Sequence, residues 1–226
     1  MEVIQIEVTD NEAYDNNAKV FSGGLNKTQV KEYYDQWVEQ YEKDLAPGRY
    51  NGPAIAADAV EKSFPRFKEK VTVLDVAAGT GFLGVELIER GYQHLHALDP
   101  SEGMLRRAQE KNVYEKFFCE FLTEDKLPIK ADTYDCVTCA GGFGQGHIPS
   151  GALRELLRIT KPGGVIVIVM REEYLNNEDY KNCLEPLMQE LHNTGKWMKL
   201  EKSIVPKYFC EKEGVVYRFR VLHQRL

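Results

Sequence analysis

One acidic residue beside a glycine-rich turn is the part of this sequence best suited to chemistry. Asp75 lies near the end of the apolar stretch 71–76, and the turn 77–81 that follows reads Ala-Ala-Gly-Thr-Gly. Apolar and β-branched residues favour a buried strand, and small residues after it let a ligand approach the backbone. A helix expected over residues 82–90 directs its free amides toward this turn. The pattern predicts a nucleotide-type binding site formed by Asp75, Ala77, Gly79 and Gly81.

Two kinds of cofactor fit this turn. The glycines of the segment Gly79-Thr80-Gly81-Phe82-Leu83-Gly84 match G-x-G-x-x-G, and Asp99 follows at about the spacing expected of a ribose ligand in an NAD site. Asp75, however, would face the negative pyrophosphate of NAD. A carboxylate there suits a cation, and S-adenosylmethionine carries an ammonium and a sulfonium but no phosphate. An NAD-dependent reductase stays open as an alternative.

Three blocks of the sequence resemble signature motifs of class I methyltransferases, in the order of that family. They are residues 73–81, residues 97–105 (Ala-Leu-Asp-Pro-Ser-Glu-Gly-Met-Leu) and residues 160–164 (Thr-Lys-Pro-Gly-Gly). Blocks at residues 34–37 (Tyr-Asp-Gln-Trp) and 142–149 (Gly-Phe-Gly-Gln-Gly-His-Ile-Pro) resemble the Williams-Beuren-region methyltransferase-like proteins. The resemblance covers roughly residues 30–197 and implies S-adenosyl-L-methionine as cofactor and S-adenosyl-L-homocysteine as product. A protein that binds this cofactor without turnover is a second alternative.

The resemblance gives each acidic residue a role. It places Asp75 near the methionine part of the cofactor, where the alternative is a carboxylate that only stabilises the turn. Asp99, followed by Pro100, is expected to accept a hydrogen bond from each ribose hydroxyl, because a carboxylate offers two acceptor oxygens. The alternative for Asp99 and Pro100 is that they merely begin the next helix.

Apolar residues are expected to enclose the adenine, and a glycine-rich loop to border the reacting methyl group. Met104 packs near the base in the family pattern, with Phe121 and Leu122 opposite, although the same residues suit an ordinary core. Ala140 leads into the loop 141–147, which ends at His147. His147 is a candidate general base, or a histidine that only bonds a backbone carbonyl. An activated sulfonium also permits transfer by alignment alone.

An aromatic stripe marks the first expected helix, residues 29–45. Tyr34, Trp37 and Tyr41 recur at spacings of three and four. Such a stripe is either core packing or, since aromatic faces attract cations, a contact for the sulfonium. Tyr34 and Trp37 are therefore included among the expected cofactor-binding residues.

The elements expected around these residues form an α/β fold with a doubly wound, mostly parallel, seven-stranded sheet. Expected strands cover residues 71–76, 94–98, 117–122, 134–140, 165–170, 198–205 and 215–222, and expected helices 53–64, 82–90, 102–111, 152–159 and 178–193. The last two strands follow without a helix, which indicates an antiparallel pair at the sheet edge. The expected domains are a flexible tail (1–25), a helical lid (26–66) and a methyltransferase domain (67–226).

Composition narrows the partners. The net charge is −6 and the basic residues are scattered, which argues against a surface that binds nucleic acid. Methyltransferases that act on amide or exocyclic amino nitrogens carry an Asn/Asp-Pro-Pro-aromatic motif after the fourth strand, and this sequence has none. We therefore expect a small-molecule or protein substrate and no nucleic acid. No apolar stretch reaches the ~20 residues that span a membrane, and no signal peptide begins the sequence. The five cysteines are unpatterned, and Cys136 and Cys139 point to opposite faces of one strand, so we expect no metal site. We expect a cytoplasmic monomer.

Overall fold

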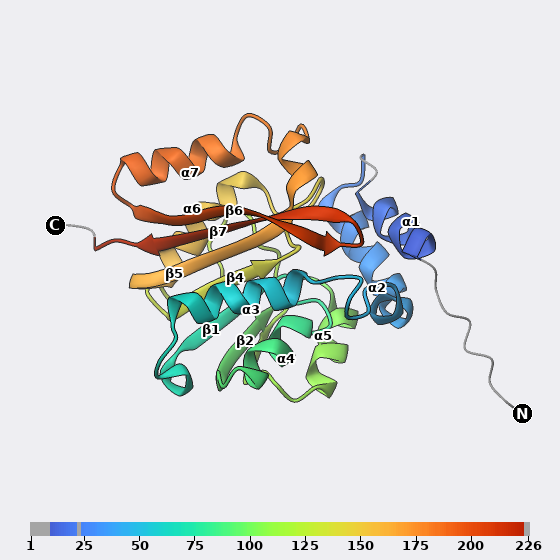
Figure 1. Cartoon of the computed structure of the whole chain (residues 1–226), viewed down its shortest axis with the longest axis horizontal. Coiled ribbons are helices and arrows are strands. Elements are labelled where there is room, and N and C mark those ends of the chain that lie inside the picture. Colours follow the sequence, from blue (N-terminus) through green and yellow to red (C-terminus); the bar gives the residue numbers. More distant parts are fainter. Residues whose placement is uncertain (1–9, 22–23, 224–226) are drawn as a thin grey trace, which may run out of the picture.

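A seven-stranded sheet forms the centre of the computed structural model, which describes residues 10–21 and 24–223 (Figure 1). Its strand order is β3-β2-β1-β4-β5-β7-β6. The strands are β1 (Thr72–Val76), β2 (His94–Leu98), β3 (Lys116–Phe118), β4 (Tyr134–Ala140), β5 (Thr160–Arg171), β6 (Trp197–Phe209) and β7 (Lys212–Val221). The first five pair in parallel, whereas β7 is antiparallel to both β5 and β6. The expected doubly wound sheet with an antiparallel edge is confirmed.

Three strands, β3, β5 and β6, differ most in length from the expectation. β3 ends at Phe118 instead of residue 122, because its partner β2 ends at Leu98 and the ladder closes with the bond from the Asp99 amide to the Phe118 carbonyl. β5 starts at Thr160, before a register shift opposite β4, and β6 continues to Phe209. The early end of β3 turns residues 119–122 out of the sheet and toward the ends of the other strands.

Helices cover both faces of the sheet, and each face buries its own core. Residues of α3 (Gly52–Ser63), α4 (Phe82–Glu89) and α5 (Glu102–Glu110) pack on one face, and those of α6 (Leu153–Ile159) and α7 (Leu184–Asn193) on the other. Cys136 and Cys139 belong to opposite cores, as the alternation of β4 requires. α7 begins later than expected, after the short helical turn Glu172–Asn176.

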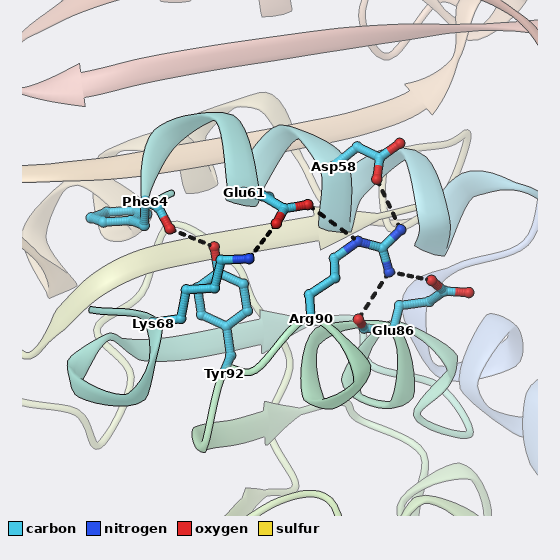
Figure 2. A network of polar contacts seen from close by, with 7 residues as sticks. All are labelled: Asp58, Glu61, Phe64, Lys68, Glu86, Arg90 and Tyr92. Carbon is cyan, nitrogen blue, oxygen red and sulfur yellow. Dashed lines mark hydrogen bonds and ion pairs between the residues drawn. The ribbon is translucent and has the colours of Figure 1, made fainter. Parts of the chain in front are cut away.

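A polar network fastens α3 to the body of the molecule (Figure 2). Arg90, at the end of α4, donates to the Asp58 carboxylate of α3 at 2.8 Å, and Lys68 pairs with Glu61 of the same helix. The hydroxyl of Tyr92 donates to the carbonyl of Phe64 at 3.0 Å. Since α3 also buries its alanine-rich face on the sheet, it is part of the helical layer. The helical lid expected over residues 26–66 therefore does not include α3.

Two helices lie together at one end of the sheet (Figure 1): α1 (Asp10–Val20) and α2 (Lys27–Asp44). Asn26 caps α2 in a capping box with Gln29. Within the tail expected over residues 1–25, residues 10–20 form the helix α1, in which Ala13 and Val20 are buried, and Tyr33 of α2 donates to the Asn16 carbonyl at 2.8 Å. Residues 1–9 and 22–23 of that expected tail lie outside the described residues.

The segment between α2 and α3 is attached to the end of β6. The Asn51 amide donates to the Tyr208 carbonyl at 2.9 Å, and the Cys210 amide donates to the Arg49 carbonyl at 2.7 Å. Within residues 10–21 and 24–223, no helix is long and apolar enough to cross a bilayer. Nor do three or more metal-ligating side chains gather anywhere in that part of the chain.

Candidate functional site

A cavity of about 920 Å³ opens at the carboxyl ends of the parallel strands. β1, β2, β4 and β5 each contribute their last residues, which are Val76, Leu98, Ala140 and Arg171. Phe21, just after α1, and Tyr34 and Tyr41 of α2 cover the opposite side. Open α/β sheets bind their ligands at this edge, and the volume lies within the usual range of ~300–1,000 Å³ for small-molecule sites.

Most residues expected to bind the cofactor or to act in catalysis line this cavity. They are Tyr34, Ala77, Gly79, Asp99, Pro100, Met104, Phe121, Leu122, Ala140 and His147. Three others, Trp37, Asp75 and Gly81, do not. The fold thus brings together residues that lie more than a hundred positions apart in the chain, because parallel strands end at one edge of the sheet.

Asp99 is held with part of its carboxylate free. Its Oδ2 accepts a hydrogen bond from the Gly79 amide and its Oδ1 one from the Ser101 amide, each at 2.9 Å. A carboxylate has about four lone-pair positions, so those left over are available to a ligand in the cavity. Only 7% of Asp99 is exposed, and burial raises the pKa of its carboxyl to about 6. Asp99 therefore couples the glycine turn to the ribose position expected from the sequence.

The turn itself needs backbone conformations that few residues adopt. Ala77 has φ 54° and Gly79 has φ 53°. The Tyr41 hydroxyl would lie 3.4 Å from a Cβ placed on Gly79, so this glycine lets backbone and helix α2 approach each other. The turn presents main chain to the cavity instead of side chains.

Asp75 lies beneath this turn. Side chains alternate along β1, so Val76 faces the cavity while Asp75 faces the other core, where its Oδ2 accepts from the Tyr114 hydroxyl at 2.6 Å. Only 2% of Asp75 is exposed, and burial raises its pKa to about 7. Asp75 does not line the cavity, so its position agrees with the alternative of a carboxylate that stabilises the turn from below, and an indirect role near the methionine part of the cofactor stays a prediction.

Gly81 and Gly84 make room for the same tyrosine. A Cβ on Gly81 would lie 3.0 Å from the Tyr114 ring and one on Gly84 only 2.4 Å from it, and the Gly84 amide donates to the Tyr114 hydroxyl. Gly81 is thus a packing residue at the start of α4, not a cavity residue. In an NAD site free amides at the start of this helix hold the pyrophosphate, whereas here the Gly84 amide is already bonded to Tyr114. The geometry argues against the NAD alternative.

Trp37 faces away from the cavity. Successive helical residues rotate by about 100°, so Tyr34 and Tyr41 lie almost in line, whereas Trp37 is turned by about 60° from Tyr34. Its indole Nε1 donates to Asp44 at 2.7 Å, only 6% of it is exposed, and Asp44 also accepts from Asn16 of α1. The cofactor contact expected of Trp37 is corrected to packing beneath α1, and Tyr41 lines the cavity in its place.

His147 and Tyr34 form a hydrogen-bonded pair at the cavity wall. The Nδ1 of His147 lies 2.8 Å from the Gln145 carbonyl, which can only accept, so Nδ1 carries the proton. In the neutral ring Nε2 then accepts from the Tyr34 hydroxyl at 3.1 Å. Phe21 stacks on the imidazole at 4.4 Å, and burial lowers the pKa of His147 to about 4. Both nitrogens of His147 are engaged, while Tyr34 keeps oxygen lone pairs for the cavity.

The residues present fit S-adenosylmethionine. Met104 and Leu122 are buried and, with Phe121, form an apolar wall suited to a purine, while Asp99 supplies acceptors for two vicinal hydroxyls. Tyr34, Tyr41 and Ala140 line the cavity on either side of the Gly79 turn. Aromatic rings and unprotonated oxygens suit a cationic sulfonium and its ammonium.

Several cavity residues were not identified from the sequence. They are Asn17, Phe21, Tyr50, Arg171, Tyr174 and Tyr208. Asn17 and Phe21 belong to the part of the chain expected to be a tail, and Tyr208 lies beyond the expected end of β6. Of these residues, only Arg171 could have been identified from the sequence, because it is a charged residue at the end of a strongly apolar strand, where open α/β sheets bind ligands.

Comparisons with known proteins agree with this geometry. A methyltransferase domain family matches residues 73–164. Human methyltransferase-like protein 27 is 34% identical over 165 residues, which are 73% of this chain and 66% of the human one. The demethylmenaquinone methyltransferase of Clavibacter sepedonicus is 41% identical over 98 residues, 42% of this chain and 39% of that protein. The chain thus covers less than two thirds of each relative.

A solved structure shares the fold. The 1,6-didemethyltoxoflavin-N1-methyltransferase of Burkholderia thailandensis, solved with its substrate and S-adenosylhomocysteine, has a TM-score of 0.61 at 14% identity, over 98% of this chain and 94% of that one. At such low identity the likeness concerns the fold alone.

Proposed function

Because this chain belongs to the class I S-adenosylmethionine-dependent methyltransferases, we propose that it transfers the methyl group of S-adenosylmethionine to a small molecule or a protein side chain. The second product is S-adenosylhomocysteine. The observation that carries this proposal is the position of Asp99. A buried carboxylate with free lone pairs lies at the end of β2, bonded to the Gly79 turn and facing a large cavity.

The cofactor supplies a methyl group already activated by the positive sulfur, which leaves with the electron pair of the broken carbon–sulfur bond. The protein's part is alignment and exclusion of water. Asp99 and the apolar wall with Met104 would hold the nucleoside, and the Gly79 turn the remainder of the cofactor. Phe21 and Tyr34 cover the cavity from the side of α1 and α2.

We propose that His147 positions Tyr34 and does not act as the general base. Its Nε2 already accepts a hydrogen bond from the Tyr34 hydroxyl, and an imidazole ring with a pKa of about 4 is a weak base at neutral pH. The Tyr34 oxygen, whose proton points to His147, can accept a hydrogen bond from an N–H or O–H group of a ligand. The acceptor's proton would then pass to water as the methyl group is transferred.

The acceptor and the setting of the protein are also proposals. An enclosed cavity with aromatic walls favours a small molecule or one side chain over a nucleic-acid base. The described cysteines are all free thiols, and this favours a reducing compartment such as the cytoplasm. We expect the protein to act as a monomer.

The proposal is tested by calorimetry with S-adenosylhomocysteine. We expect Asp99→Ala to weaken binding at least about tenfold, because bonds to a charged acceptor contribute ~1.5–3 kcal/mol each. Asp58→Ala is the matched control, since Asp58 is an exposed carboxylate on α3 that pairs with Arg90. Equal affinity of parent and Asp99→Ala for this ligand would overturn the assignment.

Turnover is tested separately from binding. The protein is incubated with methyl-labelled S-adenosylmethionine and metabolite or protein extracts, and labelled products are identified by mass spectrometry. Tight binding with no labelled product from either extract would favour the alternative of a non-catalytic cofactor-binding protein. Stabilisation by NAD instead of S-adenosylhomocysteine would favour the reductase.

A further inference from the structure

A buried arginine lies in the cavity wall, away from the residues assigned to the cofactor. Arg171 ends β5, and only 5% of it is exposed. Its guanidinium lies 4.9 Å from the ring centres of both Tyr174 and Phe209, with Tyr14 and Phe21 at 5.5 and 6.0 Å. Ring faces attract the charge, but they accept no strong hydrogen bond from its N–H groups.

The hydrogen bonds of this arginine are incomplete. Nη1 pairs with the Glu173 carboxylate at 3.1 Å and Nη2 donates to the Asn17 amide oxygen at 2.6 Å. Among residues 10–21 and 24–223, the buried Nε of Arg171 has no hydrogen-bond partner, and neither has the buried hydroxyl of Tyr174. Buried donors are nearly always paired, so two orphans beside one cavity indicate a missing acceptor.

The local charge favours an anionic acceptor. Glu173 is shared between Arg171 and Lys212, whose Nζ lies 2.9 Å from its second oxygen. Two cations and one anion leave this group with a formal charge of +1. An anion that reaches Arg171 would therefore complete both its hydrogen bonds and its charge balance.

Position and shape separate this corner from the cofactor. β5 and β2 are separated by β1 and β4, and three strand spacings put Arg171 about 14 Å from Asp99 across the sheet. Tyr50, Tyr208 and Phe209 line the cavity as well, and the Tyr50 and Tyr208 hydroxyls lie 3.3 Å apart. Aromatic side chains along the wall suit a flat molecule that can stack against them.

We propose that the methyl acceptor is a planar organic carboxylate, bound through the Nε–H of Arg171 and the hydroxyl of Tyr174. This rests on the proposed methyl transfer and specifies its substrate class. Phe21 packs against Tyr174 at 4.8 Å and against His147, so it covers the two orphan donors. The carboxylate reaches them when Phe21 turns aside, and the flat body of the acceptor then lies between Arg171 and the cofactor.

The test uses protein saturated with S-adenosylhomocysteine and benzoate as the probe. The Nε–H signal of Arg171, identified in the NMR spectrum by its loss in Arg171→Lys, is expected to shift on adding benzoate and not on adding the neutral benzamide. Arg171→Lys is expected to weaken benzoate binding at least about tenfold, and Tyr174→Phe about twofold to tenfold. Arg218→Lys is the matched control, because Arg218 is a largely buried arginine paired with Glu201 outside the cavity.

The outcomes separate the two proposals. If S-adenosylhomocysteine binds but benzoate leaves the Arg171 signal unchanged up to its solubility, or benzamide shifts it equally, the carboxylate proposal fails and methyl transfer stands. If benzoate binds equally to the parent, Arg171→Lys and Tyr174→Phe, it also fails. If S-adenosylhomocysteine does not bind the parent, the proposed function fails, and this inference fails with it.

Discussion

At the scale of single residues, position and neighbouring groups decide which of two similar buried acids faces the cavity. Asp75 and Asp99 both end parallel strands, and burial raises the pKa of both. Asp75 accepts a hydrogen bond from the Tyr114 hydroxyl, whereas Asp99 accepts from two backbone amides and keeps acceptor capacity toward the cavity. The chemistry of a carboxylate is therefore set by the face of the strand and by its neighbours.

The raised pKa of Asp99 predicts a pH dependence of cofactor binding. An ionised Asp99 can accept a hydrogen bond from each of two ribose hydroxyls, whereas a protonated Asp99 can accept fewer. The affinity for the cofactor should therefore be highest above the pKa of about 6 and should fall as the pH drops through that value. We expect calorimetry with S-adenosylhomocysteine to give about a tenfold loss for each pH unit below 6. Asp99→Asn should bind S-adenosylhomocysteine weakly, with an affinity that is nearly independent of pH between 5 and 7. If the affinity of the parent were constant over this range, it would contradict the assignment of Asp99.

The His147–Tyr34 pair gives a second prediction at this scale. Burial lowers the pKa of His147, so its ring stays neutral until the pH falls to about 4, with the proton on Nδ1. Nitrogen NMR of the histidine side chains should show this tautomer of His147 unchanged from pH 8 to pH 5. An imidazolium signal for His147 at pH 6 would restore it as a candidate general base.

At the scale of elements, hydrogen bonds between helices explain residues that look functional in the sequence. Asp35, beside Tyr34, accepts from the Ser101 hydroxyl at 2.5 Å and from the Gly103 amide at 3.2 Å. It thereby attaches α2 to the start of α5, just after Asp99. Asp35, the acid of the block 34–37, thus holds α2 in place over the start of α5 and does not itself line the cavity.

Gly81 separates packing from binding at the start of α4. Gly81 and Gly163 both have positive φ, 89° and 84°, but only a Cβ on Gly81 would meet neighbours, with Tyr114 at 3.0 Å. Gly163→Ala should cost ~1–2 kcal/mol from φ alone, a fall in melting temperature of ~2–8 °C. The melting temperature of Gly81→Ala should fall further, while its affinity for S-adenosylhomocysteine stays within about twofold of that of the parent. Lost affinity in a folded Gly81→Ala would place Gly81 in the binding site after all.

At the scale of the whole molecule, the cover and the sheet are held together differently. The sheet has two continuous cores, one on each face, whereas α1 and α2 contact it mainly around the cavity. The C-terminal end of α2 is fixed by the attachment of residues 49–51 to β6. Motion of the cover should therefore be greatest in α1 and in the first half of α2.

This arrangement predicts ligand-dependent protection of the cover. Tyr34, Tyr41 and Phe21 line the cavity, so a bound cofactor adds contacts to the segments that cover it. We expect hydrogen–deuterium exchange in residues 10–21 and 27–44 to slow when S-adenosylhomocysteine binds, with α3, which contributes no residue to the cavity, unchanged as an internal control. Equal exchange of the cover with and without ligand would assign α1 and α2 a structural role only.

The sequence by itself determined the fold and the part of the site that is local in the chain. Strand-turn-helix patterns are read over a few residues, so Gly79, Asp99 and the sheet with its antiparallel edge followed from periodicity and from the resemblance. Tertiary structure alone decided which face of β1 carries Asp75, that Tyr114 fills the space at Gly84, and that α1 packs on α2. It also placed Arg171 and Tyr174 in the cavity. These facts depend on contacts between residues that are distant in the chain. Local hydrophobic patterns do not specify such contacts, because the same side chain can fit either face of an element until its neighbours are in place.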